Sequence, residues 1–175
     1  MKLLWLAISL MLCAAQVKAE CQVLQNQQNL SYGRISAAER QTQGEEITLP
    51  EKVVVLNITC DDAQQIRLFT GTALPKDGQF GFGDRGVMSV TASQAVVDDN
   101  PVHLAVVHAG DGVQKTNGSE KVSIQLNQGI AFVNGQELRG KTASVTLTIK
   151  PKFNSGSITD RTTWRGNLRV RMVTQ

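Results

Sequence analysis

Apolar residues recur at every second position through most of this chain, which is the spacing of β-strands with one buried face. In the clearest run, 53–60, Val54, Leu56, Ile58 and Cys60 share one face, and two further valines make the other face apolar. That composition is typical of a strand buried on both sides. Other runs with the same period predict further strands, at 66–68, 87–90, 102–107, 122–126, 145–149 and 168–172.

Turn-forming residues separate these runs. They are Lys76-Asp77-Gly78, Gly81 to Gly86, Asp98 to Pro101, Asp111-Gly112, Asn117-Gly118 and Asn134-Gly135. Short strands punctuated in this way predict an all-β sandwich or barrel, and they argue against alternating strands and helices. Only 35–40 and 61–65 are expected to hold a helical turn.

The N-terminal segment 1–19 is predicted to be an export signal. Lys2 precedes an apolar stretch, Leu3 to Leu12, that is too short to cross a bilayer, and Val17-Lys18-Ala19 suits a signal peptidase. Cleavage is expected after Ala19, with Ala15 as the alternative. The remainder, 20–175, is long enough for one domain with a core of its own.

Removal of this segment leaves a chain that is close to neutral. The full sequence has 18 basic and 15 acidic residues, and the segment takes away Lys2 and Lys18, so the net charge falls from +3 to +1. No run of basic residues remains. Nucleic acid is therefore not expected as a partner.

Two cysteines stay in the predicted domain once Cys13 leaves with the signal. Cys21 and Cys60 are an even pair in a chain that is expected to be exported, so they are predicted to form a disulfide. The two cysteines are 39 positions apart. Closing a loop of that length stabilises the fold by roughly 4 kcal/mol in the chain-entropy model. A metal site is disfavoured because the cysteines and histidines lack the spacing of metal ligands.

No residue pattern predicts a catalytic, cofactor-binding or metal site, so the chain is not expected to be an enzyme. His103 and His108 are five positions apart on a predicted strand and the loop after it, and alternation would make them face opposite ways. The glycines of 81–86 lack the lysine and the strand–loop–helix context of a phosphate loop. Three aspartates fall in predicted turns, where backbone conformation favours them; they are Asp98, Asp99 and Asp111.

One local basic stripe consists of Arg165, Arg169 and Arg171. It is interpreted either as a solvated outer face that keeps an edge strand from aggregating, or as a surface that contacts acidic glycans or a chaperone. The sequence leaves both interpretations open.

Several segments, in this order, resemble the pilin domain of chaperone–usher fimbriae. The first cysteine is followed by Leu30-Ser31-Tyr32-Gly33, as in the first strand of those subunits, and the run that ends at Cys60 is followed by Asp61-Asp62. Later segments resemble the end of the third strand, the penultimate strand and the last strand; they are Phe69 to Ala73, Thr146 to Phe153 and Gly166 to Met172. Together these segments span nearly all of 20–175.

The resemblance implies an immunoglobulin-like sandwich that lacks its last strand. A strand from a periplasmic chaperone, and later one from a neighbouring pilin at the outer-membrane usher, would fill the groove that is left open. The implied groove and chaperone contacts are Leu168, Val170, Met172 and the terminal carboxylate of Gln175. Such a subunit is expected at the cell surface, in a fimbrium, with a host receptor as a further partner and no cofactor.

This chain departs from the family pattern at both ends. Structural pilins donate an apolar extension that precedes the first cysteine, whereas cleavage after Ala19 would leave only Glu20 before Cys21. The resemblance therefore implies a minor or tip subunit that accepts a strand. Thr174 stands where family members carry an aromatic residue. The alternative function is that of a self-contained periplasmic or secreted β-sandwich that binds a ligand.

Overall fold

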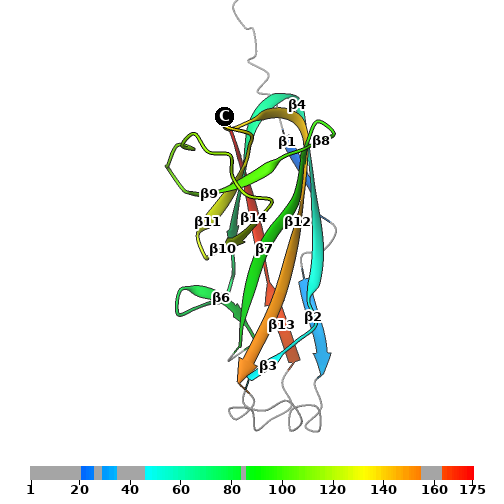
Figure 1. The fold of residues 1–175 in the computed structure, drawn as a ribbon. Coiled ribbons are helices and arrows are strands. Elements are labelled where there is room, and N and C mark those ends of the chain that lie inside the picture. The colour runs from blue at the N-terminus through cyan, green and yellow to red at the C-terminus, as the bar shows by residue number, and fades with distance from the viewer. Residues whose placement is uncertain (1–20, 26–28, 35–45, 84–85, 155–162) are drawn as a thin grey trace, which may run out of the picture.

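The structure is a computed structural model that describes residues 21–25, 29–34, 46–83, 86–154 and 163–175. The fold is all-β and every strand pair is antiparallel (Figure 1). No helix in the described part of the chain is long and apolar enough to cross a membrane. The strands are β1 (Cys21–Gln25), β2 (Asn29–Arg34), β3 (Glu46–Thr48), β4 (Lys52–Gly71), β5 (Pro75–Lys76), β6 (Gln79–Phe82), β7 (Gly86–Val97), β8 (Asn100–Pro101), β9 (His103–His108), β10 (Lys121–Ile124), β11 (Gln128–Val133), β12 (Arg139–Asn154), β13 (Thr163–Asn167) and β14 (Arg169–Thr174).

The predicted all-β class is confirmed, and each predicted run lies wholly or mainly in a strand. The predicted signal at 1–19 and the helical turn expected at 35–40 lie outside the described residues. Two of the predicted turns adopt the left-handed backbone that tight hairpins need. Asp77 and Gly78 have φ of 48° and 75°, and Asp98 and Asp99 have φ of 45° and 64°.

The helical turn that the sequence predicts at 61–65 is wrong, because this segment is extended and joins two predicted strands into β4. Pairing with β12 holds it in that conformation: Gln64 lies opposite Gly140, and Gln65 lies opposite Arg139. The Arg139 guanidinium also donates a hydrogen bond to the Ala63 carbonyl, at 3.0 Å. Long-range pairing therefore overrides the local preference here.

The long strand β4 carries the chain from one part of a curled sheet to the other. Its first half pairs with β1 and β12, and its second half pairs with β11 and β14. The strand orders are β1-β4-β12-β7 in the first part and β14-β4-β11-β9 in the second.

The main core lies between these two parts. One continuous cluster of buried side chains contains residues from both, among them Leu56 and Leu147 from the first part and Leu68 and Phe132 from the second.

Two further differences from the sequence prediction concern where strands end. The run 122–126 is shorter as a strand, since β10 ends at Ile124 and Asn127 has a positive φ of 66°. The C-terminal run divides into β13 and β14, with Leu168 between them. These two strands have different neighbours, so the division decides which part of the tail has an unpaired side.

Candidate functional site

Backbone contacts connect the two parts of the curled sheet along one side. There β10 pairs with β7, and Ser119 exchanges two backbone hydrogen bonds of 2.9 Å with Leu104 of β9. These contacts connect β7, at the end of the first part, to β9, at the end of the second. The closure is partial, since in the described structure the side of β9 turned away from β11 is bridged only at Leu104.

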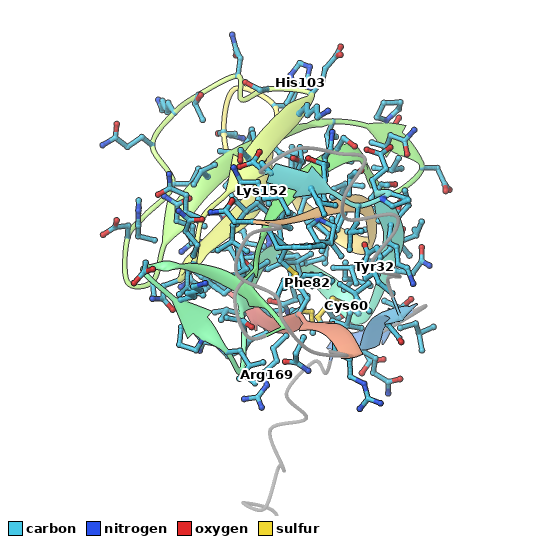
Figure 2. All side chains as sticks on the ribbon, turned by 90° about the horizontal axis from the view of Figure 1, so that it is seen from below. Tyr32, Cys60, Phe82, His103, Lys152 and Arg169 are labelled. Atoms are coloured by element: carbon cyan, nitrogen blue, oxygen red, sulfur yellow. A yellow bond between two sulfur atoms is a disulfide. The ribbon has the colours of Figure 1, made fainter. Side chains whose placement is uncertain are left out.

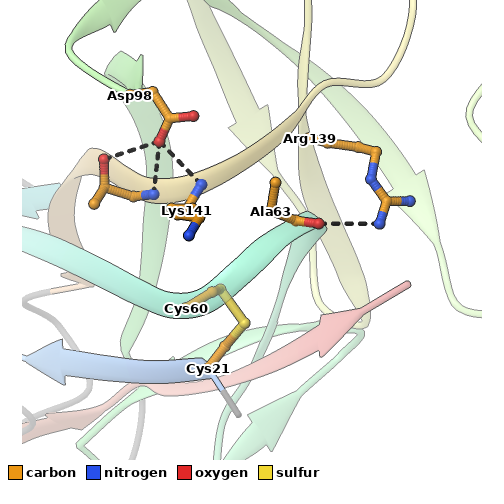
Figure 3. The surroundings of a disulfide bond; sticks show 7 residues. Cys21, Cys60, Ala63, Asp98, Arg139 and Lys141 are labelled. Carbon is orange, nitrogen blue, oxygen red and sulfur yellow. Dashed lines mark hydrogen bonds between the residues drawn. A yellow bond between two sulfur atoms is a disulfide. The ribbon is translucent and has the colours of Figure 1, made fainter. Parts of the chain in front are cut away.

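On the opposite side the sheet ends in β1 and β14. Each of these strands pairs with β4, over 56–60 and 66–71 respectively, and with no other described strand. Figure 3 shows β1 in faint blue and β14 in faint red, both crossing the view below the blue-green β4. We call the side of β14 that is turned away from β4 the unpaired edge.

The ladder with β4 shows which backbone groups lie on the unpaired edge. Gln175 and Gln65 exchange two hydrogen bonds, at N–O distances of 2.9 and 3.1 Å, and in antiparallel pairs such residues alternate with residues that exchange none. The register has no shift along β14. The residues that bond to β4 are therefore Arg169, Arg171 and Val173. The residues whose N–H and C=O groups point away from β4 are Val170, Met172 and Thr174.

The predicted groove residues take different positions in this arrangement. Val170 and Met172 lie on the inner face of β14, half-buried against the main core. Leu168 is buried, with 8% of its surface exposed, so it is part of the core. Gln175 is exposed, and its backbone oxygen accepts a hydrogen bond from the Gln65 N–H. Of these four predicted residues, only Val170 and Met172 combine apolar side chains with free backbone groups.

The opposite edge, on β1, is fixed by the predicted disulfide between Cys21 and Cys60. Their Cα atoms are 4.0 Å apart, the close spacing of a pair without backbone hydrogen bonds. The backbone groups of Cys21 and Val23 therefore also point away from β4. Both side chains lie partly buried against the main core, as those of Val170 and Met172 do.

One end of this side is closed by the chain itself. β13 pairs with β2 over 29–34, and on its other side Gly166 pairs with Phe82 of β6. Tyr32 of β2 packs edge-on against Phe82, with ring centroids 5.2 Å apart (both are labelled in Figure 2). The Lys52 ammonium lies 4.7 Å from the Tyr32 ring centre. The unpaired edge is thus limited to β14, a strand of six residues, or about 20 Å.

The arginines of the predicted basic stripe do not share one environment. Arg169 and Arg171 are exposed on the outer face of β14, and Figure 2 shows Arg169 pointing away from the body of the protein. Arg171 lies over the Phe69 ring, with its guanidinium carbon 5.4 Å from the ring centre. Arg165 lies on β13, whose two sides are both occupied.

A second, small apolar cluster covers the outer face of the second part, beside β14. It contains Phe69, Val107 and Ala131, with Val113 and Val173 at its rim. Gly129 makes room for the Phe69 ring, since a Cβ there would lie 2.7 Å from it.

Next to this cluster is a buried ion pair. Both Arg67 and Glu137 have less than a tenth of their side chains exposed, and two hydrogen bonds of 2.7 Å join them. This bonding raises the pKa of Arg67. Arg67 also donates a hydrogen bond to the Asp111 carbonyl, at 2.9 Å, which holds the loop after β9 in place. This pair could not be predicted from the sequence, because its partners are 70 positions apart.

A recess of about 440 Å³ lies between this loop and β14. Its lining includes Arg67, Phe69, Asp111, Arg171 and Gln175. The Asp111 carboxylate lies 3.7 Å from the His108 ring, and both side chains are exposed on the surface. Charged and aromatic side chains meet here without a nucleophile beside a base, so the recess offers surface for binding and no arrangement for covalent catalysis.

The other candidate side chains have structural partners. The Asp98 carboxylate accepts hydrogen bonds from the backbone of Lys141 and Thr142, at 2.9 and 2.8 Å, and from the Thr142 hydroxyl (Figure 3). His103 lies 2.9 Å from the Asn117 carbonyl. Across the described ranges, no three His, Cys, Asp or Glu side chains converge in a way that could hold a metal ion.

Comparison with known proteins connects the chain to one relative. No protein-family model matches the sequence, and no solved structure matches it. Over 163 residues it is 35% identical to YhcE of Escherichia coli (strain K12), whose name describes it as uncharacterized. The matched region covers 90% of this chain and 90% of YhcE. With that identity over nearly the full length of both proteins, the chain belongs to the same family as YhcE.

Proposed function

We propose that this protein is a structural subunit of a chaperone–usher fimbria, and that a strand from another polypeptide completes it at the unpaired edge of β14. The fold is then an immunoglobulin-like sandwich that lacks one strand. A periplasmic chaperone, an outer-membrane usher and neighbouring pilins are the partners, and the mature subunit is displayed at the cell surface. The protein needs no cofactor and performs no catalysis.

One observation carries the proposal: the unpaired edge combines free backbone groups with half-buried apolar side chains at the same residues, Val170 and Met172. A strand that paired with β14 would bond to those backbone groups and cover those side chains in one step. The backbone groups of Cys21 and Val23 on β1 would be available to its other side. On the opposite side, β10 pairs with β7, and Ser119 bridges to β9 at Leu104.

An edge of this kind is a hazard in a protein that has no partner. Exposed backbone donors and acceptors next to apolar side chains are a template for aggregation. A dedicated chaperone that adds a strand removes the hazard until assembly. This is the reason why the proposal requires a chaperone.

Periplasmic co-expression tests the proposal. The chain is expressed alone or with the fimbrial chaperone of its own host, and the soluble fraction is measured after affinity purification. We expect aggregation or degradation of the chain alone and a one-to-one complex when the chaperone is present. A stable monomer that ignores the chaperone would overturn the proposal.

A matched pair of variants locates the contact. Val170→Asp places a charge on the inner face of the unpaired edge and should abolish the complex. Val106→Asp places the same charge on β9, where the side chain is 38% exposed and remote from β14 in the strand order, and it should leave the complex intact. A complex that survives Val170→Asp would mean that the chaperone binds elsewhere.

A self-contained ligand-binding protein is the second candidate, and the recess beside Phe69 and Arg171 favours it. In that case β2 and β13 would already close the fold sufficiently for stability. The expression experiment separates the two candidates, because a ligand-binding sandwich should be soluble and monomeric without any partner.

A further inference from the structure

The two exposed arginines of β14 stand directly beside the unpaired edge. Arg169 and Arg171 are on the outer face of this strand, and within the described structure neither forms an ion pair with a carboxylate. Asp111 and the C-terminal residue Gln175 line the recess next to Arg171, yet lie outside ion-pair distance of it. Stacking on Phe69 holds Arg171 on this face.

A strand that pairs with β14 must place alternate side chains on the two faces. One set would lie on the inner face, beside Val170 and Met172. The other set would lie on the outer face, within cross-strand distance of Arg169 and Arg171. The pattern of β14 therefore specifies the chemistry of both sets.

We infer that the strand received at the unpaired edge of β14 is acidic as well as apolar: it carries Asp or Glu on its outer face, opposite Arg169 and Arg171, and apolar residues at the positions between. This inference rests on the proposed function, since it describes the partner of the same edge. The partner segment must therefore match β14 in charge as well as in apolar side chains, so it should alternate apolar and acidic residues. We call this alternation the acidic code.

The same arginines disfavour pairing between two copies of this chain. In an antiparallel β14–β14 pair, outer-face residues would lie opposite outer-face residues. In the registers that bring Arg169 and Arg171 of the two copies together, arginine would face arginine, and like charges directly opposite each other are destabilising. The code thus selects a different, acidic chain over a second copy.

Three synthetic peptides test the inference. Each has valine at alternate positions, and the positions between carry glutamate, glutamine or lysine. The purified full-length chain is refolded with each peptide, and the affinities are compared by competition against the labelled glutamate peptide. Two exposed cross-strand ion pairs predict about fivefold tighter binding of the glutamate peptide than of the glutamine peptide, and weaker binding still of the lysine peptide. High salt should reduce the difference.

A charge swap assigns the effect to these residues. In the double variant Arg169→Glu/Arg171→Glu, the preference should reverse toward the lysine peptide. The control Arg165→Glu changes the sign of one exposed arginine on β13, whose two sides are already paired, and it should keep the preference for glutamate.

The results separate the inference from the proposed function. Equal binding of all three peptides, or a preference that the charge swap does not reverse, overturns the acidic code but leaves strand addition standing. Binding of none of the peptides, with a chain that is stable alone, overturns strand addition and the code together.

Discussion

Among single residues, Asp98 shows how a turn residue can anchor a distant strand. Its carboxylate accepts three hydrogen bonds from Lys141 and Thr142, where β12 shifts its register against β4. These bonds lower the pKa of Asp98, and the largest contribution comes from the Thr142 backbone. The residue therefore joins the turn after β7 to the beginning of β12.

The lowered pKa of Asp98 makes its contribution dependent on pH. Because the folded pKa lies below the unfolded value of about 3.9, the contribution is complete above about pH 4 and is lost as the pH falls through the folded pKa. We expect Asp98→Asn, whose side chain tolerates the same turn, to be less stable than the original protein near pH 6. Urea unfolding should show this difference shrinking toward pH 2, and a difference that does not change with pH would contradict the hydrogen bonds.

Tyr32 reports whether β2 is docked. Burial raises its pKa to about 12, and its hydroxyl oxygen is buried without a hydrogen-bond partner in the described structure. Tyr32 is the only tyrosine of the chain, so its ionisation can be followed by absorbance. The burial favours the neutral form at low and neutral pH, and this contribution is lost as the pH rises from about 10 through about 12. A native titration midpoint near 10 would mean that β2 is not docked as described.

The buried pair of Arg67 and Glu137 should be far more sensitive to substitution than an exposed pair. Glu137→Ala leaves Arg67 buried without its carboxylate and should lower the free energy of unfolding by about 3–5 kcal/mol. The exposed pair of Glu46 and Lys152, 3.2 Å apart, is the control. Glu46→Ala should cost less than about 1 kcal/mol in the same denaturant measurement. Equal effects of both variants would contradict the burial of Arg67.

At the scale of elements, the alternation of apolar residues predicted the strands well but could not predict their neighbours. The alternation of Val54, Leu56 and Ile58 predicts a strand with one buried face, whichever strands lie beside it. The extended conformation of 61–65 depends on β12, which comes much later in the chain. The division of the tail at Leu168, and hence the limits of the unpaired edge, depends on β2 and β6. Pairing over such distances leaves no local trace in the sequence.

The alternation of hydrogen bonds along β14 predicts opposite effects for proline at two neighbouring positions. Val170→Pro removes an N–H that points to the unpaired edge, so it should change the stability of the fold by less than about 1 kcal/mol while preventing strand addition. Arg171→Pro removes an N–H that bonds to β4 and should destabilise the fold by about 2 kcal/mol or more. Unfolding curves and chaperone copurification measure the two effects, and the reverse ranking would mean that the hydrogen-bond pattern along β14 is inverted.

At the scale of the whole molecule, closure is uneven. Backbone contacts connect β7 to β9 beside β10, and β2 pairs with β13, whereas β1 and β14 each pair with β4 alone in the described structure. The Cys21–Cys60 disulfide ties β1 to β4 and so keeps this arrangement from fraying at its N-terminal edge. We propose that a second chain is added where β1 and β14 have no further strand beside them in the described structure.

Residue-resolved amide hydrogen exchange tests strand addition most directly. We predict that the amides of Val170, Met172 and Thr174 exchange rapidly in the chain alone and become protected in the chaperone complex. The amides of Arg171 and Val173, which bond to β4, should be protected in both states. Protection of Val170, Met172 and Thr174 in the isolated chain, or their continued rapid exchange in the complex, would contradict the account.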